Sequence, residues 1–171
     1  MAKSAAPKVT EKIVGLDEMA ALLPHHARLL GLDVGTKTIG LALSDVSRTI
    51  ATAHSTITRS KFSKDAHALL AIIAEHDIAG LVVGLPVNMD GSEGPRAQAT
   101  RAFVRNLARE CDLPVLLWDE RLSTAAAERA LLEADASRKR RGEVIDKMAA
   151  AFILQGALDR LRAFGSGQRG T

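Results

Sequence analysis

Residues 28–45 read RLLGLDVGTKTIGLALSD and decide the fold of this chain. The stretch opens with a short apolar run at 28–33, passes through a turn at 34–37 and continues as an alternating segment at 38–44. A further β-rich stretch follows at 49–58. Three successive strands joined by short links predict an antiparallel meander.

The rest of the chain switches between helical and strand patterns. The expected elements are a helix at 63–75, a strand at 80–84, a helix at 95–110, a strand at 114–118 and helices at 124–134 and 143–163. Three antiparallel strands followed by αβαβα predict an α/β fold, with a five-stranded mixed sheet flanked by helices. The crossover helices imply that the first, fourth and fifth strands run parallel.

The length of 171 residues suits one domain. We expect a partly flexible N-terminal extension at 1–26, a core domain at 27–164 and a flexible, glycine-rich tail at 165–171. Within the extension, a short amphipathic helix is expected around residues 16–23, ended by Pro24.

Composition narrows the class of protein. No apolar stretch approaches the roughly 18 residues that a membrane span needs, and the N-terminus lacks the long apolar run of a secretory signal. The single cysteine, Cys111, fits a reducing compartment. We therefore expect a cytoplasmic protein with no membrane partner.

Charge and aromatic content bear on nucleic-acid binding. The net charge of +3 is mild support for an anionic partner. Arg138, Lys139, Arg140 and Arg141 form a basic run that either attracts phosphates or is a solvated loop. Because aromatic residues make up only 3% of the chain, any nucleic acid would be recognised through its backbone rather than by base stacking.

Two acidic residues are expected at one edge of the sheet. Asp33 closes the first strand and Glu120 follows the fifth, and the carboxyl ends of parallel strands meet where ligands bind in open α/β sheets. Asp45 ends the antiparallel second strand, which places it roughly 20 Å away at about 3.3 Å per residue. Asp45 is therefore interpreted as a turn or strand-end aspartate.

A third carboxylate lies on the last expected helix. Ile145, Met148, Ala149 and Phe152 form a buried stripe, and Asp146 lies about 100° around the helix from Ile145. Asp146 either approaches the sheet edge beside this stripe or is a solvated aspartate near a helix N-terminus. The helix pattern supports the two alternatives equally.

Three converging carboxylates would repel one another without a cation. Mg²⁺ or Mn²⁺ suits oxygen ligands and would resolve that conflict. The lone Cys111 and the histidines show no zinc-ligand spacing.

The loop GLPVNMDGSEG at 84–94 has two interpretations. Its glycines and the following helix N-terminus could receive a phosphate, or Asp90-Gly91 could be ordinary turn chemistry. Taken alone, the turn is favoured.

Four motifs together resemble one known family. LLGLDVGTKTIGLALSD, VVGLPVNMDGSEG, DERLST and VIDKMAA occur in the order and spacing typical of YqgF/RuvX proteins. The resemblance covers nearly all of residues 28–161, leaves out the N-terminal extension and lacks none of the motifs. It implies a ribonuclease H-like fold related to the RuvC resolvases, with Asp33, Glu120 and Asp146 at the acidic catalytic positions.

The resemblance also implies a substrate class. The family is linked to processing of the 5′ end of precursor 16S ribosomal RNA, and earlier to resolution of Holliday junctions. The expected partners are thus structured RNA or branched DNA, and ribosomal precursor particles.

A two-metal mechanism follows as a hypothesis. Asp33 would bridge two cations about 3.5–4 Å apart, with Glu120 holding one and Asp146 the other. Lys37, Arg121 and Thr124 are candidate phosphate contacts, with the basic run at 138–141 as an outer guide. For Lys37 and Arg121, ordinary surface charge is an equal alternative.

Three other functions remain as alternatives. One is a Holliday junction resolvase acting on four-way DNA. Another is a non-catalytic RNA-binding ribosome-assembly factor. The third comes from the DVGT turn and hairpin, which resemble the phosphate-binding turn of the actin and sugar-kinase group. That group clamps ATP between two such domains, and 171 residues supply one.

Overall fold

The computed structural model describes residues 12–122 and 141–167. The helix expected at 124–134 lies outside the described residues, as do Thr124, Arg138, Lys139 and Arg140. For Arg141, the start of the last helix, only the backbone is described.

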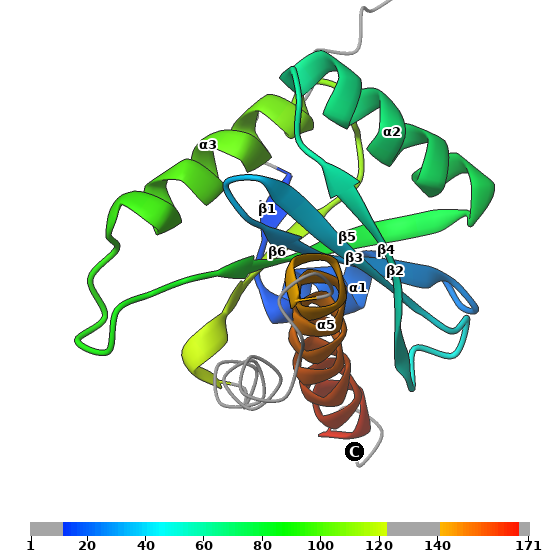
Figure 1. Cartoon of the computed structure of the whole chain (residues 1–171). Helices are drawn as coiled ribbons and strands as arrows, with labels where there is room; N and C mark the ends of the chain where they lie inside the picture. Colours follow the sequence, from blue (N-terminus) through cyan, green and yellow to red (C-terminus); the bar gives the residue numbers. More distant parts are fainter. Residues whose placement is uncertain (1–11, 123–140, 168–171) are drawn as a thin grey trace, which may run out of the picture.

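A single mixed sheet forms the centre of the molecule (Figure 1), with strand order β1-β6-β5-β2-β3-β4. Its strands are β1 (Ile13–Val14), β2 (Arg28–Val34), β3 (Thr38–Ser44), β4 (Ala51–Thr58), β5 (Ile78–Leu85) and β6 (Val115–Asp119). β2, β3 and β4 form the antiparallel meander that the sequence predicts. β5 runs parallel to both β2 and β6, as the crossover helices require.

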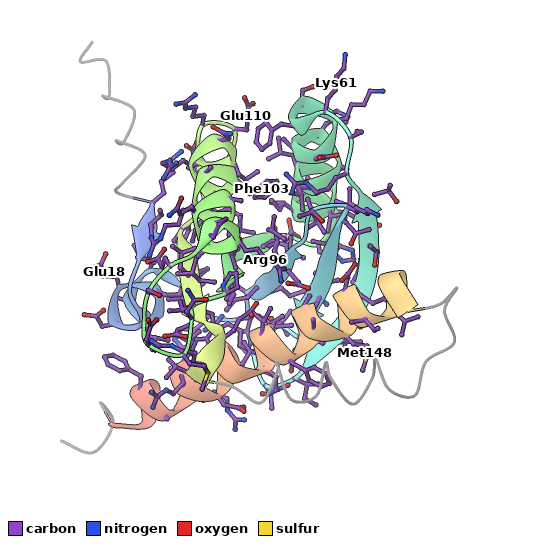
Figure 2. All side chains as sticks on the ribbon, turned by 60° about the vertical axis from the view of Figure 1, so that its left-hand side comes forward. Glu18, Lys61, Arg96, Phe103, Glu110 and Met148 are labelled. Carbon is purple, nitrogen blue, oxygen red and sulfur yellow. The ribbon has the colours of Figure 1, made fainter. Side chains whose placement is uncertain are left out.

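Helices cover both faces of the sheet (Figure 1). α2 (Phe62–Glu75) and α3 (Pro95–Ala108) lie on one face, and α1 (Leu16–Leu22) and α5 (Arg141–Gly167) lie on the other. Figure 2 shows Phe103 between α2 and α3, and Met148 on α5 at the opposite side of the sheet. None of the described helices combines the length and apolarity that a bilayer crossing needs.

Alternate residues of each strand face opposite helix layers, which produces two apolar clusters. On β2, Leu30 and Leu32 pack toward α2 and α3, whereas Leu29 packs toward α1 and α5. Both clusters are closed to solvent, because their central side chains are fully buried. Strands covered on both faces explain why β2 and β5 read as nearly continuous apolar runs in the sequence.

The structure differs from the sequence-based expectation in the number of strands. A sixth strand, β1, pairs parallel with β6 and comes from the segment expected as an N-terminal extension. The following α1 buries Met19 completely in the core. A strand of two residues is too short to leave a periodic pattern, so this pairing cannot be predicted from periodicity.

Lys12 fastens this N-terminal segment to the end of α3. Its buried Nζ donates hydrogen bonds to the carbonyl oxygens of Ala108 and Cys111 and to Oδ1 of Asp112. Carbonyl groups in the last turn of a helix lack partners within the helix, and a cation there also interacts favourably with the helix dipole. Lys12 therefore caps α3 while it joins β1 to the core.

Candidate active site

Asp33 lies at the centre of the candidate site. It is the penultimate residue of β2 and only 5% exposed. It shares a face with Gly31, which lies against Leu154 of α5, because residues two apart on a strand point to the same side. Asp33 is therefore directed to the α5 side of the sheet.

Glycines flank Asp33 on both neighbouring strands. Gly40 of β3 is its direct partner in the antiparallel pair. Gly84 of β5 lies one position beyond the pair formed by Leu32 and Val83. Neither neighbour has a side chain, so other parts of the chain can approach the sheet closely on both sides of Asp33.

Asp146 occupies the space above Gly40. A Cβ on Gly40 would lie 2.0 Å from the carbonyl oxygen of Asp146, so the backbone of α5 rests directly on β3. Oδ2 of the half-buried Asp146 accepts a hydrogen bond from the hydroxyl of Thr38. Of the two placements that the sequence allowed for Asp146, this contact corresponds to the one at the sheet edge beside Asp33.

Glu120 occupies the space above Gly84. It begins η2 (Glu120–Leu122), the short 3₁₀ turn that follows β6. A Cβ on Gly84 would lie 2.8 Å from Oε1 of Glu120 and 2.5 Å from Cδ1 of Ile153 on α5. The carboxylate of Glu120 is thus on the α5 side of the sheet, at the strand next to that of Asp33.

The three acidic residues therefore lie on the same face of the sheet, on or against the neighbouring strands β3, β2 and β5. Asp33 lies between two glycines, with Asp146 above one and Glu120 above the other. Within the described part of the chain, no three His, Cys, Asp or Glu side chains form a group that could hold a metal ion as they stand. All three side chains are carboxylates, which is the type of ligand that hard divalent cations prefer.

Asp45 has the structural role that the sequence predicted. It follows β3 and accepts hydrogen bonds from the Ser47 hydroxyl and from the backbone N–H groups of Thr49 and Ile50. These bonds, that of Ser47 first, lower the pKa of Asp45 to about 2. Asp45 fixes the turn to β4 at the end of β3 away from Thr38 and takes no part in the carboxylate site.

Arg121 is not a free surface cation. Its guanidinium Nε and Nη2 donate to both carboxylate oxygens of Asp119, over distances of 2.7 to 3.1 Å. The Arg121 guanidinium lowers the pKa of the Asp119 carboxyl in return. Lys37, the other expected phosphate contact, is exposed in the turn between β2 and β3.

A cleft of about 500 Å³ borders Glu120. The loop after β5, the first turn of α3 and the η2 turn form it. Its lining residues are Pro86, Val87, Asn88, Met89, Gly94, Pro95, Arg96, Ala97, Glu120 and Arg121. Met89 projects from this loop and is 91% exposed. A larger cavity, of about 580 Å³, lies between α1 and the C-terminal half of α5, and none of the three carboxylates lines it.

The loop at 84–94 shows the turn chemistry that the sequence favoured. Asp90 Oδ1 accepts hydrogen bonds from the backbone and hydroxyl of Ser92, and Asn88 N–H donates to the Ser92 carbonyl. This internal bonding shapes the wall of the cleft beside Glu120.

The sequence did not single out two residues that support the site. Thr38 bonds Asp146, and Arg59 holds the turn after Asp33. Arg59 donates from its guanidinium to the Gly35 carbonyl and from its backbone N–H to the Lys37 carbonyl, and it stacks 5.5 Å from the ring centroid of Phe103. Both roles depend on contacts between distant elements, which local periodicity does not reveal.

The chain resembles known proteins over most of its length. The model of the family RuvX, described as a Holliday junction resolvase, matches residues 27–160. A Rhodobacter capsulatus protein named "Putative pre-16S rRNA nuclease" is 64% identical over 151 residues, which span 88% of this chain and 95% of that protein. A Rhizobium meliloti protein of the same name is 57% identical over 158 residues, 92% of this chain and 96% of that protein.

Solved structures show the same fold at low sequence identity. Thermus thermophilus RuvC in complex with a Holliday junction substrate aligns with a TM-score of 0.51 and 15% identity, over 80% of this chain and 96% of RuvC. A second structure of the same protein gives a TM-score of 0.51 and 16% identity, over 80% of this chain and 97% of RuvC. The similarity extends to the ribonuclease H-like architecture of the sheet and its helices.

Proposed function

This chain belongs to the RuvX family and is a nuclease. We propose that Asp33, Glu120 and Asp146 hold the divalent cations with which it hydrolyses phosphodiester bonds. We further propose that its substrate is the 5′ end of precursor 16S ribosomal RNA, within ribosomal precursor particles in the cytoplasm. Relatives 57 to 64% identical over most of their length carry the name of a nuclease for this RNA.

One observation carries the catalytic proposal. Asp33 lies between two glycines, and the positions above them are occupied by the backbone of Asp146 on α5 and by the carboxylate of Glu120 on η2. The three residues are far apart in the sequence, yet strand pairing and helix packing bring them to one face. Repulsion makes such a grouping unfavourable without a cation.

The three carboxylates are the proposed cation ligands. Asp33, Glu120 and Asp146 would hold Mg²⁺ or Mn²⁺ through their carboxylate oxygens. Cations held there would supply the Lewis acidity that activates an attacking water and stabilises the charge on the phosphate and the leaving oxygen. Asp33 is part of the sheet, whereas Glu120 is on the short turn that follows β6.

We propose that the substrate reaches Glu120 through the cleft that this residue lines. Arg96 and Arg121 line it, and Lys37 is exposed on the turn after Asp33. Arg121 is held in place by Asp119, which reduces the conformational freedom it would lose on meeting a phosphate. We propose Arg121, Lys37 and Thr124 as backbone contacts, with the basic run at 138–141 as a longer-range attraction.

Four-way DNA is the second candidate substrate. The matching family model is described as a Holliday junction resolvase, and the fold is that of a RuvC enzyme. The same carboxylate chemistry would serve RNA and DNA, because the cations act on the phosphodiester and not on the base. A direct comparison of the two substrates separates these candidates.

The experiment compares wild type with Asp33→Asn on a 5′-extended 16S precursor fragment and on a four-way DNA junction. Each reaction is run with Mg²⁺, with Mn²⁺ and with EDTA. Asp77→Asn is the matched control: Asp77 is exposed, lies before β5 at the opposite edge from Asp33, and has a positive φ of 52° that asparagine tolerates. We expect RNA cleavage by wild type and Asp77→Asn only with a cation, and none by Asp33→Asn.

Other outcomes point elsewhere. Cleavage of the junction but not of the RNA would assign the resolvase activity. Binding of the RNA without cleavage, by wild type with either cation, would indicate the non-catalytic assembly factor.

A further inference from the structure

We propose that Thr38 is a positioning residue for cation binding, because its hydroxyl donates a hydrogen bond to Oδ2 of Asp146 and so orients that carboxylate. The inference rests on the proposed metal-dependent nuclease and concerns how this chain prepares one of its carboxylates. Thr38 is the first residue of β3, and its hydroxyl donates to Asp146, which is 108 residues further along the chain.

The backbone of Thr38 provides a fixed base for this bond. Its carbonyl oxygen accepts a hydrogen bond of 2.9 Å from the Gly35 N–H, which closes the turn after Asp33. In the sheet, Thr38 pairs with Thr58 of β4. A β-branched side chain in a strand also has few rotamers, so the hydroxyl is held in direction as well as in position.

The partner is equally well placed. Asp146 lies where α5 rests on Gly40, and Gly40 is on the same face of β3 as Thr38, two residues further on. The hairpin formed by β2 and β3 therefore carries both Asp33 and the residue that orients Asp146. This arrangement couples the first and last acidic residues of the site through one local structure.

The physical consequence is a carboxylate that is ordered before a cation arrives. A threonine hydroxyl has one hydrogen to donate, and donation to an ionised carboxylate is a strong, charge-assisted bond. It restrains rotation of the Asp146 carboxylate and takes up part of its negative charge. Hydrogen-bond partners of metal ligands typically change metal affinity by roughly tenfold to a hundredfold when they are removed.

The test measures Mn²⁺ binding by isothermal titration calorimetry, without nucleic acid, on the full chain. Thr38→Val keeps the shape of the side chain but removes the hydroxyl, whereas Thr38→Ser keeps the hydroxyl. We expect Thr38→Val to bind Mn²⁺ roughly tenfold to a hundredfold more weakly than wild type, and Thr38→Ser to stay within about threefold. Thr38→Ala, a second variant without the hydroxyl, should weaken binding as Thr38→Val does.

Thr58→Val is the matched control, since Thr58 is the exposed cross-strand partner of Thr38. It should bind Mn²⁺ as wild type does. Thermal unfolding in EDTA verifies that each variant is folded before its titration.

The outcomes separate this inference from the proposed function. Wild-type affinity in both Thr38→Val and Thr38→Ala would overturn the role of Thr38 while leaving the three carboxylates in place. Absence of Mn²⁺ binding by wild type, or wild-type binding by Asp33→Asn, would instead overturn the proposed metal site and the inference with it.

Discussion

Asp146 rests on Gly40 by direct backbone contact: a Cβ on Gly40 would lie 2.0 Å from the Asp146 carbonyl oxygen and 2.8 Å from the Lys147 backbone nitrogen. Helix α5 can approach β3 this closely only because Gly40 has no side chain. Gly31 allows a similar approach on β2, where a Cβ would lie 2.7 Å from Cβ of Leu154. The position of Asp146 is thus determined by the packing of a helix against glycines of the sheet.

Gly40→Ala should damage both stability and cleavage. The added methyl group would meet helix backbone, which cannot rotate away, so α5 must shift and carry Asp146 with it. We expect a loss of about 1–3 kcal/mol in the free energy of unfolding, measured in urea, together with a large loss of cleavage.

Gly165→Ala is the contrasting variant for this prediction. Nothing lies within 4 Å of the position of a Cβ on Gly165, which is also in α5. Alanine there should stabilise the helix by about 0.5–1 kcal/mol and leave cleavage unchanged. Wild-type stability and activity in Gly40→Ala would contradict the packing described for Asp146.

Gly84→Ala should reduce cleavage clearly while lowering stability less than Gly40→Ala does. The new methyl group would meet the ends of two side chains, Ile153 Cδ1 at 2.5 Å and Glu120 Oε1 at 2.8 Å. Side-chain ends can move, so we expect a smaller loss of stability than in Gly40→Ala but a clear loss of cleavage as Glu120 is displaced. The measurements are urea unfolding and the rate of cleavage with Mg²⁺.

A double variant checks the cause of that effect. Ile153→Val removes Cδ1 and should offset part of the stability loss of Gly84→Ala, beyond the sum of the single changes. It should not restore cleavage, because the contact with Glu120 persists. Recovery of cleavage in the double variant would show that Glu120 is not the group that Gly84 accommodates.

Lys12→Met should destabilise the protein without affecting cleavage. The variant leaves the carbonyl oxygens of Ala108 and Cys111 without the Lys12 ammonium. Loss of hydrogen bonds to a buried charged group should cost about 1.5–3 kcal/mol in urea unfolding. Lys61→Met is the control, since Lys61 is exposed before α2 and projects away from the protein (Figure 2), and it should change stability little.

Asp45→Asn should lower stability by an amount that depends on pH. The pKa of Asp45 is lowered from 3.8 to about 2 in the folded protein, so the ionised carboxylate stabilises the fold above pH 4. This contribution disappears as the pH falls through about 2, because both states are then protonated. After allowance for solvent screening, we expect a difference of about 1 kcal/mol or less at pH 6.

Urea unfolding from pH 6 to pH 2 measures this difference. The gap between wild type and Asp45→Asn should narrow as the solution is acidified. Cleavage at neutral pH should be unchanged, because Asp45 is at the end of β3 away from the carboxylates. A large loss of cleavage in Asp45→Asn would place this residue in the site after all.

The positions of Asp33, Glu120 and Asp45 could be predicted from the sequence, because strand order and direction alone assign each residue to an edge. Asp146 could not be assigned in the same way. It is about 100° around the helix from Ile145, in the buried stripe. Only the contact with Gly40 shows that it lies at the sheet edge and not in solvent. The pairing of Arg121 with Asp119 was missed for a related reason, since it depends on how the chain turns after β6.

The central claim is that the carboxylates of Asp33, Glu120 and Asp146 together bind the catalytic cations. The most direct measurement is anomalous diffraction from crystals of the wild-type protein grown with saturating Mn²⁺. We expect an anomalous peak coordinated by oxygens of Asp33 and of at least one of Glu120 and Asp146. An ordered site without such a peak, in a protein preparation that cleaves RNA with Mn²⁺, would contradict the proposed cation site.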